Sequence, residues 1–274
     1  MTVRRDREYV HGTDPEEQGR LADLNTLINR ASLAAIAPRA GERLIDFGSG
    51  LGQFARDFAR VAGTPALGIE RSDEQRTRAV AFAAEANEST LAEYRAGDAV
   101  TPPLRADEWG TFDVAHARFL LEHVRDPQAV VNAMARAVRP GGRVVLEDDE
   151  HSTFQLWPEP PLVTLVWNAY QRTYDRVGAD PHVGKRLVQL LSVAGLQPTR
   201  IDQLPFGACA GQPTFVPLVR NLGLLFRGAH GAILATGGVS ATEFAAALDA
   251  LEAFARRGDA AFWYTTRWAE AVRT

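Results

Sequence analysis

Apolar residues follow two patterns between positions 43 and 148, and the two patterns alternate along the chain. Short apolar runs are typical of strands that are buried on both faces, as in a parallel sheet. Such runs occupy 43–47, 65–70, 93–96, 112–116 and 142–146. Apolar residues three or four positions apart predict helices between them, at 50–62, 72–86 and 126–138. The alternation predicts a doubly wound α/β sheet with right-handed crossovers.

The pattern differs on either side of this region. An amphipathic helical pattern over 14–37 precedes it, and prolines at 158, 160 and 161 interrupt the chain after it. Helices are then predicted over 162–177, 184–194, 213–226 and 241–256, and a strand over 196–204. The aromatic segment 261–272 suits a strand, although a helix over its second half stays open.

These changes of pattern divide the chain into a core and additions to it. The expected parts are a helical lead (1–40), a cofactor-binding core (41–152), a helical cap insertion (153–183), a continuation of the core (184–206), a second cap insertion (207–258) and a C-terminal core strand (259–274).

Composition and charge narrow the possible partners. The chain is 46% apolar and 23% charged, an ordinary globular balance, and its net charge of −4 offers no basic surface for a nucleic acid. Cys209 is the only cysteine, which excludes an internal disulfide and fits a reducing cytoplasm. No apolar run has the length of a membrane helix or a signal peptide. We expect a cytoplasmic protein with a small-molecule partner, and neither a nucleic-acid nor a membrane partner.

Three glycines, Gly48, Gly50 and Gly52, follow the first predicted strand in the stretch LIDFGSGLGQF. Glycines at such a turn let backbone amides approach an anion or a nucleoside. The spacing is G-x-G-x-G, whereas a dinucleotide site uses G-x-G-x-x-G, and position 53 is a glutamine. The Gly-Lys-Ser/Thr ending of a Walker loop is also absent from the stretch, so a different nucleoside ligand is indicated.

Residues 46–52 (DFGSGLG) resemble the first motif of class I S-adenosylmethionine-dependent methyltransferases. Further matches fall at predicted strand edges in the same order: Glu70, Gly97-Asp98-Ala99, the LLEHV stretch at 120–124 and the RPGG turn at 139–142. Together they resemble the ubiquinone/menaquinone-biosynthesis type. The resemblance implies a Rossmann-like, seven-stranded, mostly parallel sheet, S-adenosylmethionine as cofactor, and methyl transfer to a small organic acceptor, with secondary metabolism as the setting.

The resemblance also implies a set of cofactor-binding residues: Tyr9, Arg20, Asp46, Gly48, Ser49, Gly50, Gly52, Glu70, Arg71, Asp98, Ala99, Ala117 and Arg118. In it, Glu70 accepts hydrogen bonds from both ribose hydroxyls. Asp46 accepts hydrogen bonds from loop amides and orients the methionine ammonium group. The alternative is that Asp46 only stabilises the loop through a local Asx interaction. Tyr9 and Arg20 close over the methionine end, or are ordinary surface residues.

Methyl transfer from a sulfonium chiefly needs alignment of the acceptor, and a general base is an optional addition. The ends of the strands are where such a base belongs, so we name His151, His116 and Asp148 as catalytic candidates, with His151 first. The alternative for His151 is a solvent-facing loop residue. Asp148 and Asp149 are adjacent acids without an identifiable third ligand, so we expect no metal.

Acceptor choice is expected to reside in the cap. Trp167, Tyr170 and Tyr174 recur at i, i+3 and i+7 and form either an aromatic wall for the substrate or part of the core. The aromatic C-terminal segment leaves a homodimer open. Two other functions share part of the pattern: a non-methylating S-adenosylmethionine binder such as a cyclase or a regulator, and a nicotinamide-dependent reductase, which the missing third glycine disfavours.

Overall fold

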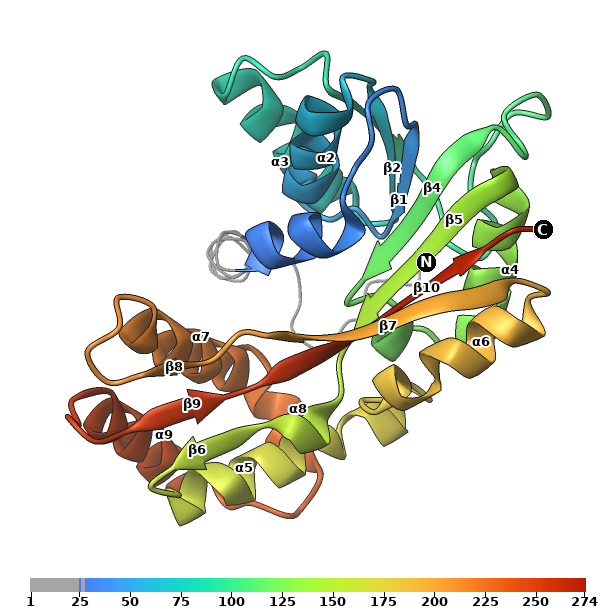
Figure 1. Ribbon diagram of the computed structural model, residues 1–274. Helices are drawn as coiled ribbons and strands as arrows, with labels where there is room; N and C mark the ends of the chain where they lie inside the picture. The colour runs from blue at the N-terminus through green and yellow to red at the C-terminus, as the bar shows by residue number, and fades with distance from the viewer. Residues whose placement is uncertain (1–24, 26–27) are drawn as a thin grey trace, which may run out of the picture.

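Seven strands form the central sheet, in the order β3-β2-β1-β4-β5-β10-β7 (Figure 1). The computed structural model describes residue 25 and residues 28–274. Within that part the strands are β1 (Leu44–Phe47), β2 (Ala66–Glu70), β3 (Ala92–Ala96), β4 (Phe112–Arg118), β5 (Val138–Asp148), β7 (Gln197–Pro205) and β10 (Thr265–Val272). β10 pairs antiparallel with β5 and with β7, and the other described strand pairs of this sheet are parallel. The predicted doubly wound, mostly parallel sheet is confirmed.

Helices cover both faces of this sheet. On one face lie α2 (Gln53–Ala62) and α3 (Asp73–Glu85), and on the other lie α4 (Pro127–Ala137) and α6 (Leu187–Val193). Because both faces are covered, every residue of β1 and β2 is buried, which explains why these strands are mostly apolar. Parallel strands joined in this way bring their carboxyl ends to one edge of the sheet, where α/β proteins bind ligands.

A second sheet of three short strands lies beside the core, in the order β6-β9-β8. Its strands are β6 (Gln155–Trp157), β8 (Ala208–Cys209) and β9 (Ala261–Trp263). It packs with α5 (Pro161–Gln171), α7 (Phe215–Gly228), α8 (His230–Ala235) and α9 (Ala241–Ala255), and we call this assembly the cap (Figure 1). The predicted helices of the cap are present, and the short strands β6 and β8 are an addition that the sequence pattern did not predict. Strands of two or three residues are too short to give a period-two pattern.

Two chain segments run through both sheets. The predicted strand over 261–272 is present in both of its halves, but it is divided at Tyr264 into β9 in the cap and β10 in the core. In the same way β7 leads into β8 (Figure 1). The cap and the core are thus joined by a two-stranded connection, and Tyr264 lies at the point where that connection leaves the core.

The helix predicted over 162–177 ends early. It stops at Gln171, and a separate 3-10 turn, η3 (Tyr174–Arg176), follows. The Thr173 hydroxyl donates to the Tyr170 carbonyl at 2.7 Å, a local bond that competes with continuation of the helix. Tyr170 and Tyr174 consequently lie on different elements.

Within the described part of the chain, no helix combines the length and the apolar character needed to cross a membrane. Cys209 is exposed and carries a free thiol.

A capping box begins α9, the longest helix of the cap. The Ser240 hydroxyl accepts the amide hydrogen of Glu243 at 3.2 Å, and the Glu243 carboxylate accepts that of Ser240 at 2.8 Å. Replacing Ser240 with alanine is expected to lower the free energy of unfolding by about 1 kcal/mol, because amides of the first turn lose their acceptor. Urea denaturation measures this change. The matched control is Thr242→Ala in the same exposed turn, and equal effects of the two changes would contradict the prediction.

Candidate active site

The glycine loop between β1 and α2 is folded against the end of β2. The amides of Gly48 and Ser49 both donate to the Ile69 carbonyl, at 2.9 and 3.0 Å. Gly48, Gly50 and Gly52 have φ values of 68°, 52° and 68°, in the left-handed region that glycine adopts without strain. The loop therefore needs glycine at these positions for its own shape, and it presents main chain at the edge of the sheet.

Glu70 ties this loop to the turn after β2. One carboxylate oxygen accepts the Gly50 amide hydrogen at 2.9 Å, and the other accepts that of Ser72 at 2.7 Å. Burial raises the pKa of Glu70, and these amide donors oppose the rise. Each oxygen keeps a second lone pair, so the carboxylate can still receive a pair of ligand hydroxyls.

The other predicted residues on this side of the edge are more open. Arg71 and Asp98 are exposed, and Asp98 accepts the Val100 amide hydrogen at 2.8 Å in a local turn. Ala99 is partly buried and packs against the core, whereas Ala117 is fully buried within β4. Tyr9 and Arg20 lie outside the described residues.

Asp46 is paired with His116 in the structure. Its Oδ1 lies 2.8 Å from His116 Nδ1, and the His116 ring stacks on Phe54 of α2 with centroids 4.2 Å apart. Both polar side chains are buried. Within the described part of the chain, no loop amide donates to Asp46, so its expected partners in the loop are replaced by an imidazole that fixes its direction.

Arg118 connects the end of β4 to the helical lead. Its guanidinium donates to Asn25 and Asn29 side-chain oxygens at 2.9 and 2.6 Å, and to the Ser32 hydroxyl at 3.0 Å. Burial lowers the pKa of Arg118, and the nearby charge of Glu147 opposes that effect. The donors of Arg118 are thus used by Asn25, Asn29 and Ser32, and its predicted contact with the cofactor stays a prediction.

Asp148 serves the main chain. Its fully buried carboxylate accepts amide hydrogens from Leu120, Leu121 and Glu122 at 3.2, 2.8 and 3.3 Å, and from Asp149 at 3.0 Å. It thereby anchors the 3-10 turn η1 (Leu121–His123) that follows β4. The expectation of a catalytic Asp148 is corrected, since the donors that satisfy both oxygens belong to the backbone.

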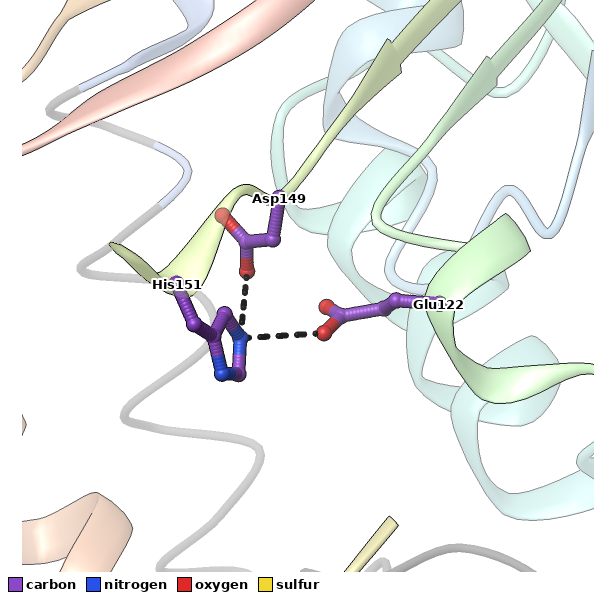
Figure 2. Close-up of side chains that lie close together, drawn as sticks. All are labelled: Glu122, Asp149 and His151. Atoms are coloured by element: carbon purple, nitrogen blue, oxygen red, sulfur yellow. Dashed lines mark ion pairs between the residues drawn. The ribbon is translucent and has the colours of Figure 1, made fainter. Parts of the chain in front are cut away.

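His151 lies between two carboxylates, as Figure 2 shows. It begins the 3-10 turn η2 (His151–Thr153) after β5, and its Nε2 lies 3.2 Å from Glu122 Oε2 and 3.6 Å from an Asp149 oxygen. The imidazole is only 2% exposed, and its Nδ1 has no hydrogen-bond partner among the residues that the structure describes. His151 is therefore not the solvent-facing loop residue of the alternative interpretation.

Electrostatics in this group depend on burial and on the close charges. Burial alone would lower the pKa of His151, but Asp149 and Glu122 outweigh it and raise that pKa to about 9. Burial and the charge of Glu122 raise the pKa of Asp149 to about 7. Burial opposes ionisation of Glu122, yet His123 and His151 hold the pKa of that carboxyl below its usual range. Near neutral pH, His151 is therefore largely protonated beside an ionised Glu122, and Asp149 lies close to its own titration midpoint.

Tyrosines hold the two carboxylates. Tyr174 donates to Glu122 Oε2 at 2.9 Å, and the Tyr170 hydroxyl lies 2.8 Å from that of Tyr174. Tyr264 donates to Asp149 Oδ1 at 2.8 Å. These three rings are buried, so each hydroxyl bond is shielded from water.

The aromatic residues proposed for acceptor binding surround His151. The ring of Trp167 lies 4.9 Å from that imidazole, and those of Tyr170 and Tyr174 lie 5.6 and 5.3 Å away. All three also belong to the apolar core of the cap. They combine the two alternatives, because they pack the cap and form the surroundings of the candidate base.

Glu122 and Tyr264 were not predicted as site residues. Glu122 lies after β4 and Asp149 after β5, and these two strands are neighbours in the sheet. The carboxyl ends of adjacent parallel strands meet at one edge, so the sheet order could have indicated the Glu122 contact. The position of Tyr264 depends on the division of 261–272 between two sheets, for which the sequence pattern gives no sign.

Several buried polar atoms along this edge have no hydrogen-bond partner among the described residues. Apart from Nδ1 of the candidate base, they are Ser49 Oγ, Gln53 Oε1, His116 Nε2 and Glu147 Oε2. Buried polar atoms in folded proteins are normally paired, so a run of unpaired atoms indicates where a polar ligand belongs. Together with the free lone pairs of Glu70, they fit S-adenosylmethionine, which has an ammonium group, a carboxylate and two ribose hydroxyls.

Three side chains at the same edge have atom types that could bind a metal ion. Glu122, Asp149 and His151 each place one ligand-type atom within 4.8 Å of the others. However, each carboxylate already accepts a tyrosine hydroxyl and faces the imidazole N–H. We interpret the group as a proton-sharing network, and the absence of a resident metal stays a prediction.

Known proteins resemble this chain in sequence and in fold. A family model described as a methyltransferase domain matches residues 17–200. The ubiquinone biosynthesis O-methyltransferase of Ralstonia nicotianae is 30% identical over 184 residues, which cover 66% of this chain and 73% of that protein. The 27-O-demethylrifamycin SV methyltransferase of Amycolatopsis mediterranei is 33% identical over 152 residues, which cover 55% of this chain and 52% of the relative.

A solved structure shares the fold. The geranyl diphosphate C-methyltransferase of Streptomyces coelicolor A3(2), in complex with Mg²⁺, geranyl-S-thiolodiphosphate and S-adenosyl-L-homocysteine, superposes with a TM-score of 0.56 at 15% identity. The match covers 90% of this chain and 75% of that one.

Proposed function

Given that this chain belongs to the methyltransferase-domain family and is an S-adenosylmethionine-dependent methyltransferase for a small organic acceptor, we propose that the accepting atom is a hydroxyl oxygen and that His151 removes its proton. The observation that carries this proposal is the pairing state of the imidazole. Nε2 faces two carboxylates, whereas the buried Nδ1 has no partner within the described part of the chain. The free nitrogen is the atom that can accept a proton.

The reaction needs few steps from the protein. Bound S-adenosylmethionine supplies a methyl carbon on a positively charged sulfur, which is a good leaving group. The acceptor hydroxyl gives its proton to His151 Nδ1, its oxygen forms the new bond to the methyl carbon, and the electron pair of the breaking carbon–sulfur bond stays on sulfur. Placing the oxygen about 3 Å from the carbon supplies most of the acceleration.

The residues that hold the cofactor are proposed on the fit described above. The amides of the glycine loop would face the methionine carboxylate, and Glu70 would accept the ribose hydroxyls. Asp46, oriented by His116, would face the methionine ammonium group. Arg71, Asp98 and Ala99 would border the adenine.

The acceptor class is proposed from the relatives and from the cap. Both relatives described above are named as methyltransferases that act in the synthesis of specific small molecules, one of them an O-methyltransferase. Trp167, Tyr170 and Tyr174 give the surroundings of His151 an aromatic character that suits a flat or apolar acceptor. A cytoplasmic role in secondary metabolism and a homodimer are part of the same proposal.

Isotopic labelling tests this function directly. The protein is incubated with S-adenosylmethionine labelled in its methyl group and with a panel of phenols, catechols, aliphatic alcohols and primary amines. The expected product is a labelled methyl ether. Label that never leaves the donor across the panel would favour a cyclase or regulator and overturn the proposal, and label found only on nitrogen or carbon would overturn the hydroxyl assignment.

The rate of methyl transfer is expected to rise with pH, to be half-maximal near pH 9 and to level off at about one pH unit above that midpoint. His151 acts as a base only when neutral, and its pKa of about 9 keeps it largely protonated at pH 7. Initial rates between pH 6.5 and about 10 with the best acceptor measure this profile. A second acceptor with a different hydroxyl pKa is the control, because a profile set by the enzyme keeps its midpoint. A rate independent of pH over this range would contradict the prediction.

A further inference from the structure

The geometry points to Glu122 and Asp149 as positioning residues for the reaction: they hold the Nε2–H of His151 and leave Nδ1 as the basic atom. We further assign Tyr174 and Tyr264 as the side chains that hold these two carboxylates. This inference rests on the proposed function, since it concerns how the candidate base is prepared for an acceptor.

The tautomer follows from counting donors and acceptors. A neutral imidazole carries one N–H and one bare nitrogen, and a carboxylate beside a nitrogen favours the N–H there. Two carboxylates lie at Nε2, at 3.2 and 3.6 Å, and no described group lies in hydrogen-bond reach of Nδ1. The neutral form of His151 therefore carries its proton on Nε2.

The carboxylates are themselves fixed in direction. Glu122 Oε2 accepts the Tyr174 hydroxyl at 2.9 Å, and the other Glu122 oxygen lies 3.3 Å from His123 Nε2. Asp149 Oδ1 accepts the Tyr264 hydroxyl at 2.8 Å, so the remaining Asp149 oxygen faces the imidazole. Since all these groups are buried or nearly so, rotation away from His151 would leave a polar atom unpaired.

Titratable groups from several elements face the His151 imidazole. The titratable groups that face it are Glu122 of η1, Asp149 after β5, Tyr170 of α5, Tyr174 of η3 and His182 before η4 (Val183–Arg186). His182 Nδ1 itself lies 2.8 Å from a Glu150 oxygen, so this nitrogen is engaged by a carboxylate other than Glu122 and Asp149. The two carboxylates are the only anionic groups among the described residues that lie within ion-pair distance of His151.

Nitrogen NMR of the imidazole tests the inference without an acceptor. The full chain is labelled with ¹⁵N at histidine, and the His151 signals are assigned by their loss in His151→Asn. In the wild type, the neutral ring is expected to carry its proton on Nε2. In Glu122→Gln and in Asp149→Asn, the midpoint of the His151 titration is expected to fall by about one pH unit or more, because an attractive charge is lost.

The Tyr174→Phe variant is expected to move the midpoint of the His151 titration in the opposite direction. Tyr174→Phe removes a donor that partly neutralises Glu122, so the His151 midpoint should rise, by on the order of half a pH unit. The matched control is Glu150→Gln, which removes a buried carboxylate next to His151 that is bonded to Ser152 and His182 instead. This control is expected to change the midpoint clearly less than Glu122→Gln.

Three results would overturn the inference. One is a wild-type neutral ring protonated on Nδ1, and another is an unchanged midpoint in both carboxylate variants. The third is tight binding of Mg²⁺, Mn²⁺ or Zn²⁺ that calorimetry detects in the wild type and not in Glu122→Gln, since the carboxylates would then serve a metal. The labelling experiment fails separately: loss of methyl transfer with the expected NMR result overturns the proposed function and leaves the tautomer assignment in place.

Discussion

Replacing His151 with asparagine is expected to lower kcat by ~10²–10⁴-fold, the usual contribution of a positioned general base. Asparagine keeps a polar side chain of similar reach but cannot take a proton at neutral pH. The affinity for S-adenosylmethionine should stay close to that of the wild type, because the proposed cofactor residues lie at the ends of β1 and β2 and in the loops after β1, β2 and β3. Initial rates with the best acceptor and calorimetry with the cofactor alone measure the two quantities.

The control for this variant is His230→Asn. His230 is an exposed histidine of α8, and its ring lies 4.6 Å from that of Phe244 in the cap. It should leave kcat within a factor of about two to three. Similar rates in His151→Asn and in the wild type would mean that alignment of the acceptor alone drives the reaction and that His151 is not a general base.

Replacing Glu70 with glutamine is expected to raise the dissociation constant of S-adenosylmethionine at least about tenfold, since a hydrogen bond to a charged group contributes roughly 1.5–3 kcal/mol and 1.4 kcal/mol is a factor of ten. The amide removes the negative charge and turns one acceptor into a donor, which then faces the amide hydrogen of Gly50 or Ser72. Isothermal titration calorimetry measures the change.

Glu85→Gln is the matched control for Glu70→Gln. Glu85 ends α3 in the same half of the sheet, with an exposed side chain 3.9 Å from Arg78. Its replacement should leave cofactor affinity unchanged. A thermal melt of both variants without cofactor separates loss of binding from loss of the folded state. An unaltered affinity in a folded Glu70→Gln protein would contradict the proposed contact with the ribose.

The central sheet could be predicted because its strands are long enough to show their pattern. Mostly apolar runs such as 44–47 and 66–70 arise when helices cover both faces of the sheet. The helices between them instead carry apolar residues three or four positions apart. The cap could be predicted only in part. Its helices carry a period near 3.6, whereas β6, β8 and β9 contain three, two and three residues and leave no period to read.

The candidate base was predicted from its place after the fifth strand, but its neighbours required the structure. Asp148 and Asp149 are adjacent in sequence, and successive side chains of an extended segment point to opposite sides. Asp148 therefore faces the amides of η1, while Asp149 faces His151. The sequence does not distinguish these two directions, because both residues are acids at the end of the same apolar run.

The division of the cofactor residues from the acceptor residues follows the chain itself. The proposed cofactor contacts come from the first half of the sheet, and the aromatic rings near His151 come from segments inserted after β5. The first group could be predicted from local motifs, because each motif lies at a strand end. The second group depends on contacts between residues far apart in sequence, such as Tyr264 with Asp149.

The two-stranded connection between the sheets gives the cap a fixed mechanical relation to His151. Tyr264 lies in that connection and Tyr174 follows the first cap helix, so both hydroxyls that hold the carboxylates belong to chain segments outside the cofactor half of the sheet. A displacement of the cap would lengthen both bonds together and change how strongly the imidazole keeps its proton. The pKa of His151 would then report whether the cap is in its described position.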